Sequence, residues 1–241
     1  MSELIRIDKF ISSQLNISRT DAKKVIKGNF VSINGTEVKK SDLIINPYED
    51  CVSVYGKEIH YKKYIYLMMN KPKGVVSATT DNNETTVLDI IPENLRRNGL
   101  FPAGRLDKNT TGFMLITDDG EFAHNILSPA HHVKKTYIAR TESMLNDGDL
   151  AVFANGMKIG DEVFKPAEIR FIASYDNANF DYEIKIVEGR YHQIKRMFGS
   201  TGNPVIELER IAIGKLPLDR NLKPGEAKEL TKTDIELLKS R

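Results

Sequence analysis

An aspartate occupies an unusual position in the stretch GRLDKNTTGFMLITDDG, residues 104–120. Asp107 lies just ahead of a hydrophobic run that is bounded by glycines. An aspartate in such a loop ordinarily caps a turn, but a carboxylate is also a group that enzymes use as a nucleophile or a general base. Two distant segments carry side chains that would complement it. Tyr137 ends KKTY, and the adjacent cations Lys195 and Arg196 follow GRYHQI.

An acid, an aromatic ring and a cation together suit one kind of site. Such a site flips a base out of a nucleic acid, stacks it on the ring and presents a carboxylate kept ionised by the cation. Two alternatives remain open from the residues alone. Asp107 with Asp118, Asp119 or Glu121 would make a hydrolase, although DDG is first of all a turn sequence. The chain would otherwise be an RNA-binding protein without activity.

The composition limits the classes of protein. The chain has 241 residues, 40% hydrophobic and 28% charged, which is enough for a small domain and a larger one. No apolar run approaches the roughly 20 residues that cross a bilayer, and charges occupy the start of the chain where a signal peptide needs its apolar core, so we expect a cytoplasmic protein. With one cysteine, Cys51, five histidines without a ligand-like pattern and no glycine-rich phosphate loop, we expect no metal and no cofactor.

The first 60 residues concentrate basic charge on one helix face. A helix is predicted over 18–29, with Ser18 as its N-cap and Asp21 three positions later. Arg19, Lys23 and Lys27 fall within about 80° of one another at 100° per residue, beside an apolar face. The segment 30–38 alternates around Asn34-Gly35, a strong hairpin signal, and 50–56 alternates again.

The pattern changes near 58–64, where we place a boundary between a domain of residues 1–60 and one of residues 64–241. The larger domain is predicted to be α+β, with an extended mixed, mainly antiparallel sheet flanked by helices. Strands are expected at 64–74, in 112–120, at 134–141, 162–174, 180–189 and 205–216, and helices at 85–91, through 124–127, and at 145–156, 190–200 and 233–240.

The front unit resembles the αL RNA-binding module named after a small-subunit ribosomal protein, on IRIDKFIS (5–12) and SRTDAKKVIKGNFVSINGTEV (18–38). That module binds RNA with its second helix and the hairpin after it. The resemblance therefore implies an RNA-binding surface, which here consists of Lys9, Arg19, Lys23 and Lys27. Flexible cations on one face can neutralise phosphates without reading sequence.

Residues 64 to about 220 resemble the RsuA/RluB-type pseudouridine synthases. The resemblance rests on MMNKPKGVVSATTDNNETTVLDIIP, on 101–139 with GRLDKNTTG and KKTYIA, on EGRYHQIKRMF and on ERIAIGKLPLD. It implies isomerisation of a uridine in ribosomal RNA, with SPAHHVKKTY closer to members that act on the small subunit. The implied partner is ribosomal RNA or an assembling small subunit, and the enzyme is expected to be a monomer that uses neither cofactor nor membrane.

The same resemblance assigns roles to single residues. Asp107 and Tyr137 match the catalytic aspartate and the active-site tyrosine, and Lys195 matches the cation that pairs with the aspartate, with Arg196 as the alternative. Leu216 matches an apolar residue under the target base. The remaining substrate-binding residues are expected to be Arg105, Arg190, His192 and Arg196.

Overall fold

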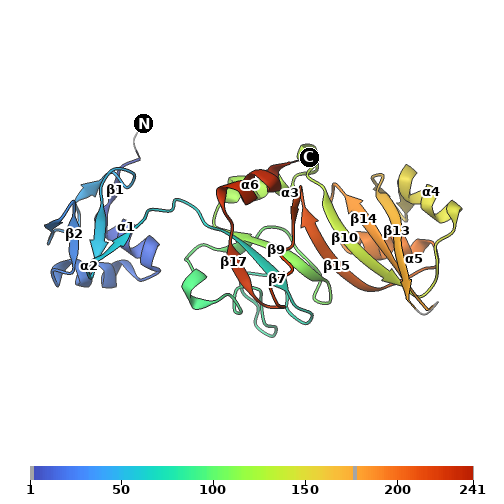
Figure 1. Ribbon diagram of the computed structural model, residues 1–241, viewed down its shortest axis with the longest axis horizontal. Coiled ribbons are helices and arrows are strands. Elements are labelled where there is room, and N and C mark those ends of the chain that lie inside the picture. Colours follow the sequence, from blue (N-terminus) through green and yellow to red (C-terminus); the bar gives the residue numbers. More distant parts are fainter. Residues whose placement is uncertain (1–2, 176–177, 241) are drawn as a thin grey trace. The chain divides into compact units, whose positions relative to one another are not determined.

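The computed structural model describes residues 3–175 and 178–240. The chain divides into two compact units (Figure 1), one of Met1–Ile65 with Arg96–Gly99 and one of Tyr66–Leu95 with Leu100–Arg241. Within the described residues, no helix has both the length and the apolar character needed to cross a membrane.

The first unit combines two helices with a small antiparallel sheet. Its four-stranded sheet has the order β3-β2-β5-β6, and β1 pairs with β4. Ser18 accepts a hydrogen bond from the Asp21 backbone N–H, as predicted, and starts α2. The elements are β1 (Ile5–Arg6), α1 (Ile7–Leu15), α2 (Arg19–Lys27), β2 (Val31–Ile33), β3 (Thr36–Glu37), β4 (Ile44–Ile45), β5 (Val52–Val54) and β6 (Lys57–Ile59).

The predicted hairpin at Asn34-Gly35 is present between β2 and β3. Both turn residues have positive φ, 50° and 81°, which matches the twist of the flanking strands. The unit has its own core of apolar side chains, in which Phe10 and Ile26 bring α1 and α2 onto β2 and β5. Residues 96–99 belong to this unit, and the Arg97 guanidinium donates to the carbonyls of Lys62 and Lys63 at 2.8 and 2.9 Å.

The second unit is built on one large mixed sheet. Its strands follow the order β13-β14-β10-β15-β9-β7-β17, and among the strand pairs of the described residues only β15–β9 is parallel. The sheet is therefore mainly antiparallel, as predicted. Its strands are β7 (Tyr66–Lys71), β8 (Phe101–Pro102), β9 (Thr111–Thr117), β10 (Lys135–Thr141), β13 (Glu168–Tyr175), β14 (Asn179–Ile186), β15 (Val205–Ile213), β16 (Leu216–Pro217) and β17 (Ala227–Glu229), and β11 (Met157–Ile159) pairs with β12 (Glu162–Phe164) outside it.

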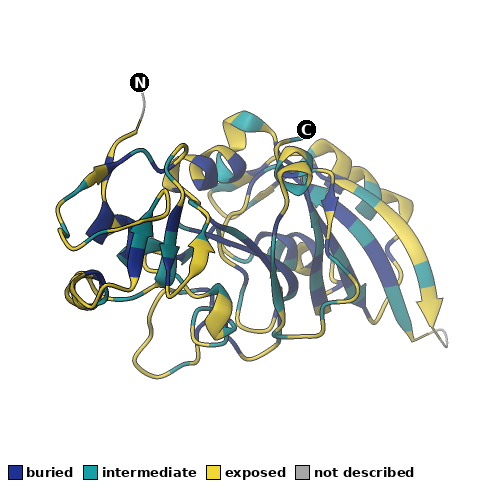
Figure 2. Cartoon of the chain, turned by 60° about the vertical axis from the view of Figure 1, so that its left-hand side comes forward, coloured by how far each residue is buried: buried dark blue, intermediate teal, exposed yellow. Residues whose placement is uncertain are grey.

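The helices of this unit cover two parts of the sheet. Near β7 and β9, α3 (Gly120–Leu127) and α6 (Lys232–Lys239) bury Phe122 and Leu238 against Phe113. Near β14, α4 (Asp147–Asn155) and α5 (Gln193–Ser200) meet through Phe153 and Phe198, whose ring centroids are 4.8 Å apart. Buried residues run along the strands between them, and the outer helix faces are exposed (Figure 2).

The junction between β15 and β9 depends on a glycine. The two strands share only the pairs Glu209–Thr111 and Arg210–Gly112. Gly112 has φ +95°, and a Cβ there would lie 2.3 Å from the Arg210 carbonyl oxygen. No other residue permits so close an approach, so the glycine that ends GRLDKNTTG joins the two parts of the sheet.

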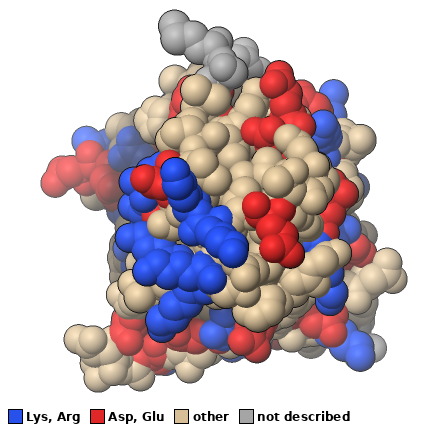
Figure 3. Space-filling model, turned by 90° about the vertical axis from the view of Figure 1, so that its left-hand side faces the viewer, with Lys and Arg blue, Asp and Glu red and all other residues tan. Residues whose placement is uncertain are grey.

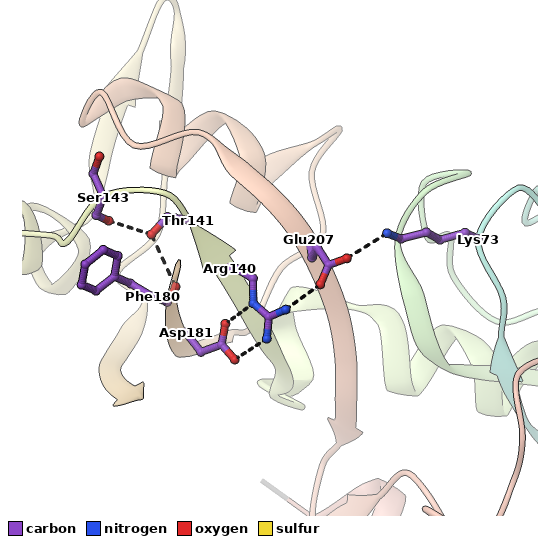
Figure 4. A network of polar contacts seen from close by, with 7 residues as sticks. All are labelled: Lys73, Arg140, Thr141, Ser143, Phe180, Asp181 and Glu207. Carbon is purple, nitrogen blue, oxygen red and sulfur yellow. Dashed lines mark hydrogen bonds and ion pairs between the residues drawn. The ribbon is translucent and has the colours of Figure 1, made fainter. Parts of the chain in front are cut away.

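Ion pairs reinforce the same junction (Figure 4). Arg140 on β10 forms a bidentate pair with Asp181 at 2.7 and 3.0 Å and donates to Glu207 on β15 at 3.0 Å. Lys73, which follows β7, donates to the other oxygen of Glu207 at 3.0 Å. The network links four segments on the sheet face opposite Tyr137.

Three expectations about elements are wrong. The helix expected at 85–91 is a turn, because Thr86 and Asp89 bond to each other's backbone and side-chain groups instead of continuing a helix. The strand expected at 162–174 is two strands, β12 and β13, interrupted at Pro166, which has no N–H to donate. The helix expected from residue 190 begins at Gln193, because His192 has a left-handed conformation with φ 48°.

Candidate active site

Asp107 lies in a tightly held loop between β8 and β9. The buried Ser77 hydroxyl donates to the Leu106 carbonyl at 2.8 Å and accepts from the Leu106 N–H at 3.0 Å. After the aspartate, the Thr110 N–H donates to the Asp107 carbonyl at 3.0 Å and closes a turn. The backbone on both sides of Asp107 is therefore fixed by hydrogen bonds, which limits where its carboxylate can point.

The side chain of Lys71 holds this loop through hydrogen bonds to its backbone. Its ammonium group is fully buried and donates to the carbonyls of Pro72, Lys108 and Thr110 at 2.9–3.1 Å. Burial lowers the Lys71 pKa to about 8, against the opposing effect of the Asp107 charge. Lys71 thus gathers three carbonyl oxygens around one cation at the end of β7, and so fixes the backbone that follows Asp107.

The Asp107 carboxylate meets two side chains from the segment around α5. Lys195 Nζ lies 2.7 Å from one carboxylate oxygen, and His192 Nε2 lies 3.2 Å from the other. The Asp107 side chain keeps 26% of its surface exposed. The carboxylate is therefore held by its neighbours and remains open to a ligand.

The left-handed backbone at His192 explains how α5 reaches Asp107. His192 immediately precedes the helix, and its ring stacks on Tyr191 with centroids 3.9 Å apart. Lys195 follows three residues later, so both side chains project from the first turn toward the same carboxylate.

Tyr137 lies beside this carboxylate on β10. It is only 7% exposed and faces the same cavity. Arg210, directly opposite on β15, places its guanidinium over the Tyr137 ring and donates to the hydroxyl at 3.5 Å. Arg210 is itself fixed by a 2.7 Å hydrogen bond to the Phe113 carbonyl. The Arg210 guanidinium thus fixes the position of the Tyr137 side chain.

A cavity of about 60 Å³ unites these groups. Asp107, Tyr137 and Lys195 line it, together with the apolar side chains of Ile186 and Leu208. Arg105, Arg190 and His192, which the sequence indicated as candidates for binding substrate, also line it. The structure therefore brings together six of the eight residues that the sequence indicated for the catalytic and substrate-binding roles.

Arg196 and Leu216 lie elsewhere. The Arg196 guanidinium pairs with Glu162 on β12 and lies over the Phe164 ring, because consecutive helical residues point about 100° apart. Leu216 on β16 is buried in the core formed with α3 and α6. Leu208 and Ile186 occupy the apolar wall of the cavity instead. Both belong to buried runs in which no pattern distinguishes a cavity wall from the core.

The acids considered for a hydrolase serve the fold or lie outside this cavity. Asp119 is the N-cap of α3, where it accepts a hydrogen bond from the Phe122 N–H at 3.0 Å and another from the Tyr66 hydroxyl at 2.6 Å. Asp118 and Glu121 do not line the cavity of Asp107 among the residues that the structure describes. A two-carboxylate site is not formed there.

The first unit carries a second candidate surface. Lys and Arg side chains gather on the face that Figure 3 shows. Lys9, Lys23 and Lys27 are exposed and have no acidic partner within the described residues. Arg19 differs, because its guanidinium lies 3.0 Å from both oxygens of the buried Asp8. Burial alone would raise the Asp8 pKa, but hydrogen bonds from Arg6 and Arg19 outweigh it and lower that pKa.

Comparison with known proteins identifies the family of the chain. The family model described as RNA pseudouridylate synthase matches residues 65–200, and the model of the S4 domain matches residues 5–47. The chain therefore belongs to the RNA pseudouridylate synthase family and is an RNA pseudouridine synthase, an isomerase.

Individual relatives cover nearly the whole chain. It is 41% identical to the uncharacterized RNA pseudouridine synthase YtzG of Bacillus subtilis over 97% of this chain and 98% of that protein. It is 40% identical to the ribosomal small subunit pseudouridine synthase A of Escherichia coli K12, over 96% and 98%. A crystal structure of a pseudouridylate synthase, 36% identical, superposes with a TM-score of 0.66 over 97% of this chain and 99% of the other.

Proposed function

We propose that this synthase converts one uridine of small-subunit ribosomal RNA to pseudouridine, with Asp107 as its catalytic carboxylate. The observation that carries the proposal is the Asp107 carboxylate held between Lys195 and His192 at a cavity lined by Tyr137. The target class is supported by the Escherichia coli relative, which is named a ribosomal small subunit pseudouridine synthase.

The reaction rearranges bonds without adding or removing atoms. The bond between the ribose C1′ and N1 of uracil breaks, the base turns, and C1′ bonds to C5. N1 then carries a proton and C5 loses one. Asp107 acts either as a nucleophile on the ribose or the base, or as the group that takes a ribose proton. Each role needs an ionised carboxylate, and the ammonium of Lys195 lies 2.7 Å from that carboxylate.

Tyr137 would hold the extruded base. Stacking on an aromatic ring contributes about 1–3 kcal/mol per base, comparable to the few kcal/mol that extrusion costs. The hydroxyl, fixed by Arg210, is a candidate to take the C5 proton. Leu208 and Ile186 provide an apolar wall for the uracil.

The first unit would supply most of the affinity for RNA. Lys9, Lys23 and Lys27 present free cations for phosphates. We further propose that the enzyme works in the cytoplasm as a monomer with no cofactor. The reaction transfers neither electrons nor a phosphoryl group, and one chain holds the proposed carboxylate, cation and stacking ring.

The Asp107→Asn variant tests the proposal. Asn keeps the size and turn preference of Asp but cannot act as a nucleophile or a general base. We expect pseudouridine formation in small-subunit ribosomal RNA to be abolished, with melting temperature and RNA affinity near those of the wild type. The assay is carbodiimide labelling of RNA in single turnovers with enzyme in excess.

Each contrary outcome has a clear meaning. Residual turnover within about tenfold of the wild type, or about 1.4 kcal/mol, would rule out Asp107 as the sole catalytic carboxylate. Wild-type labelling of large-subunit RNA alone would refute the target class. If Asp107→Asn does not fold, Lys195→Met replaces it as the test of the site, because this variant keeps the Asp107 carboxylate.

A further inference from the structure

A second, larger cavity adjoins the one that contains Asp107. It measures about 570 Å³ and shares Arg105, Tyr137, Gly189 and Arg190 with the smaller cavity. If a ligand binds at Asp107, the parts of it that flank the bound portion therefore lie beside this second cavity. The reaction proposed above gives it no role.

Two buried cationic side chains with unused hydrogen-bond donors lie in the wall of this cavity. Lys135 is 4% exposed and Arg210 is 3% exposed. Lys135 Nζ and one terminal nitrogen of Arg210 are buried and have no hydrogen-bond partner among the described residues. A buried charge without a partner is costly and rare in a folded protein. Here the Lys135 ammonium has no partner among the described residues, and Arg210 on the paired strand β15, which already donates to Phe113 and Tyr137, keeps one donor nitrogen unused.

The rim of the cavity adds two more cations. Arg105 and Lys165 are exposed, and neither side chain has an acidic partner within the part of the chain that the structure describes. Arg190 completes the set.

Of the described residues that line this space, Glu188 alone is acidic, and its carboxylate is already occupied. It accepts from the Lys165 backbone N–H at 2.9 Å and from the Gln193 side chain at 2.8 Å, and it lies 3.5 Å from Arg190. The cavity is therefore strongly positive, and its own acid does not neutralise Lys135 or Arg210.

We propose that this cavity is a phosphate-binding subsite, in which Lys135 and Arg210 hold a backbone phosphate of the RNA next to the nucleotide at Asp107. A phosphate offers several acceptor oxygens, which suit one ammonium and one guanidinium donor on neighbouring strands. The subsite rests on the proposed function, because it takes its phosphate from the RNA bound at Asp107. It would fix the backbone on one side of the flipped uridine and so position the base on Tyr137.

The protonation of Lys135 is consistent with this role. Burial, with the nearby charge of Arg210, lowers the Lys135 pKa to about 8. The group therefore keeps its proton at neutral pH, and an anion bound beside it would stabilise the charged form.

Lys135→Met tests the subsite, because methionine keeps an unbranched side chain and removes the ammonium. The control is Lys158→Met on β11, an exposed lysine with the same charge change. If Lys135→Met fails to fold, the rim variant Lys165→Met replaces it. The first measurement is inorganic phosphate binding, by calorimetry and by the shift in melting temperature. We expect phosphate to bind the wild type and Lys158→Met, and to bind Lys135→Met at least tenfold more weakly.

The second measurement identifies the source of the phosphate. Once the target uridine is mapped, short RNAs carry one neutral methylphosphonate in place of each nearby phosphate in turn. We expect Lys135→Met to weaken binding of the unmodified RNA about tenfold to a hundredfold, as for a charged hydrogen bond. At one position the methylphosphonate should weaken RNA binding by the wild type as much as Lys135→Met does. At that position it should cause no further loss of RNA affinity in the Lys135→Met variant.

Three outcomes would overturn the subsite. In the first, the wild type binds phosphate, but at every linkage the effects of the methylphosphonate and of Lys135→Met on RNA affinity add up. This would mean that the site takes a free anion and not the RNA backbone. No phosphate binding and unchanged RNA affinity in Lys135→Met would mean that the cavity holds only water. Slower turnover with unchanged affinity would mean that Lys135 acts through Tyr137. A wild type that binds phosphate but forms no pseudouridine would refute the proposed function and leave an anion site.

Discussion

Lys195 and Arg196 are neighbours in the chain but lie beside different carboxylates. Lys195 contacts Asp107, whereas Arg196 contacts Glu162. The residue types alone left both available as the partner of Asp107. What separates them is the rotation of about 100° between consecutive helical residues, combined with the start of α5 at Gln193. A sequence motif specifies the set of side chains, and the helix phase decides which one reaches the acid.

The two cations should differ in their effect on the reaction. Lys195→Met removes the ammonium beside Asp107, and we expect single-turnover rates to fall at least about a hundredfold, with RNA affinity within about threefold. Arg196→Met removes the same charge from the Glu162 pair and should leave the rate within about threefold. Single-turnover kinetics at saturating enzyme separate the two. A larger loss for Arg196→Met would mean that the wrong cation is assigned.

The buried Lys135 should make the free energy of unfolding of the protein depend on pH. Its pKa is about 8 in the folded protein, against 10.5 for a free lysine, because burial and the Arg210 charge disfavour its proton. Between these values the unfolded chain binds more protons, so this lysine's contribution to stability rises with pH. Lys135→Met should therefore be more stable than the wild type at pH 7, by at most about 3.5 kcal/mol, because the two pKa values differ by about 2.5 at about 1.4 kcal/mol per pKa unit.

Urea denaturation of both proteins at pH 7 and pH 9.5 tests this. The difference in unfolding free energy should shrink at the higher pH, where the wild-type ammonium has lost its proton. The other titratable groups that line the cavity, Tyr137, Lys165 and Glu188, are present in both proteins, so the comparison isolates the effect of Lys135. A gap that is the same at both pH values would show that packing, and not the buried charge, separates them.

Short sequence patterns predicted those helices, strands and turns that depend on neighbouring residues alone. The Asn34-Gly35 hairpin, the Ser18 N-cap and the long strands β9, β10 and β14 follow from turn chemistry, capping and hydrophobic runs. The short strands β11 and β17 were not expected, because three residues carry too little pattern.

The site was harder to predict than the elements. Arg210 and Leu208 reach it through the pairing of β15 with β10, and strand register depends on contacts between distant segments. One signal was available for Arg210: in VIELERIAI (205–213) it falls in the same alternating phase as Leu208, whereas the two glutamates of the strand fall in the other phase. His192 was indicated by the family resemblance, but its contact with Asp107 had no local signal, because the left-handed backbone at His192 is not specified by its residue type.

The β15–β9 junction should tolerate no side chain at Gly112. Gly112→Ala places a Cβ 2.3 Å from the Arg210 carbonyl and forces a left-handed conformation on alanine, so we expect it to destabilise the second unit by more than about 2 kcal/mol. Gly160→Ala is the matched control, since Gly160 also has positive φ but nothing lies within 4 Å of its Cβ position. Denaturation measures both. Equal losses would show that strain in φ, and not the strand contact, explains the requirement.

For the whole molecule, the proposed roles assign RNA affinity and chemistry to different compact units. The exposed cations Lys9, Lys23 and Lys27 belong to one compact unit, and Asp107 and Tyr137 belong to the other. Each unit has its own hydrophobic core. A change on α2 should therefore alter RNA binding without disturbing the carboxylate, and this separation can be measured.

The double variant Lys23→Ala with Lys27→Ala tests this separation. Arg19 is left intact because it partners the buried Asp8, and its loss would confuse binding with stability. We expect weaker RNA binding and a salt dependence shallower by up to about 0.7 per lost phosphate contact for single-stranded RNA. Single-turnover rates at saturating enzyme should stay within about twofold of the wild type.

The matched control is Lys215→Ala with Lys232→Ala, which removes two exposed lysines from the second unit. It changes the net charge equally, so a general electrostatic effect would lower the affinity and the salt slope of both double variants alike. A specific surface on α2 would make only the first variant lose slope, since counterions are released only where a lysine meets a phosphate. Equal slopes in the two variants would mean that α2 is an ordinary solvated helix.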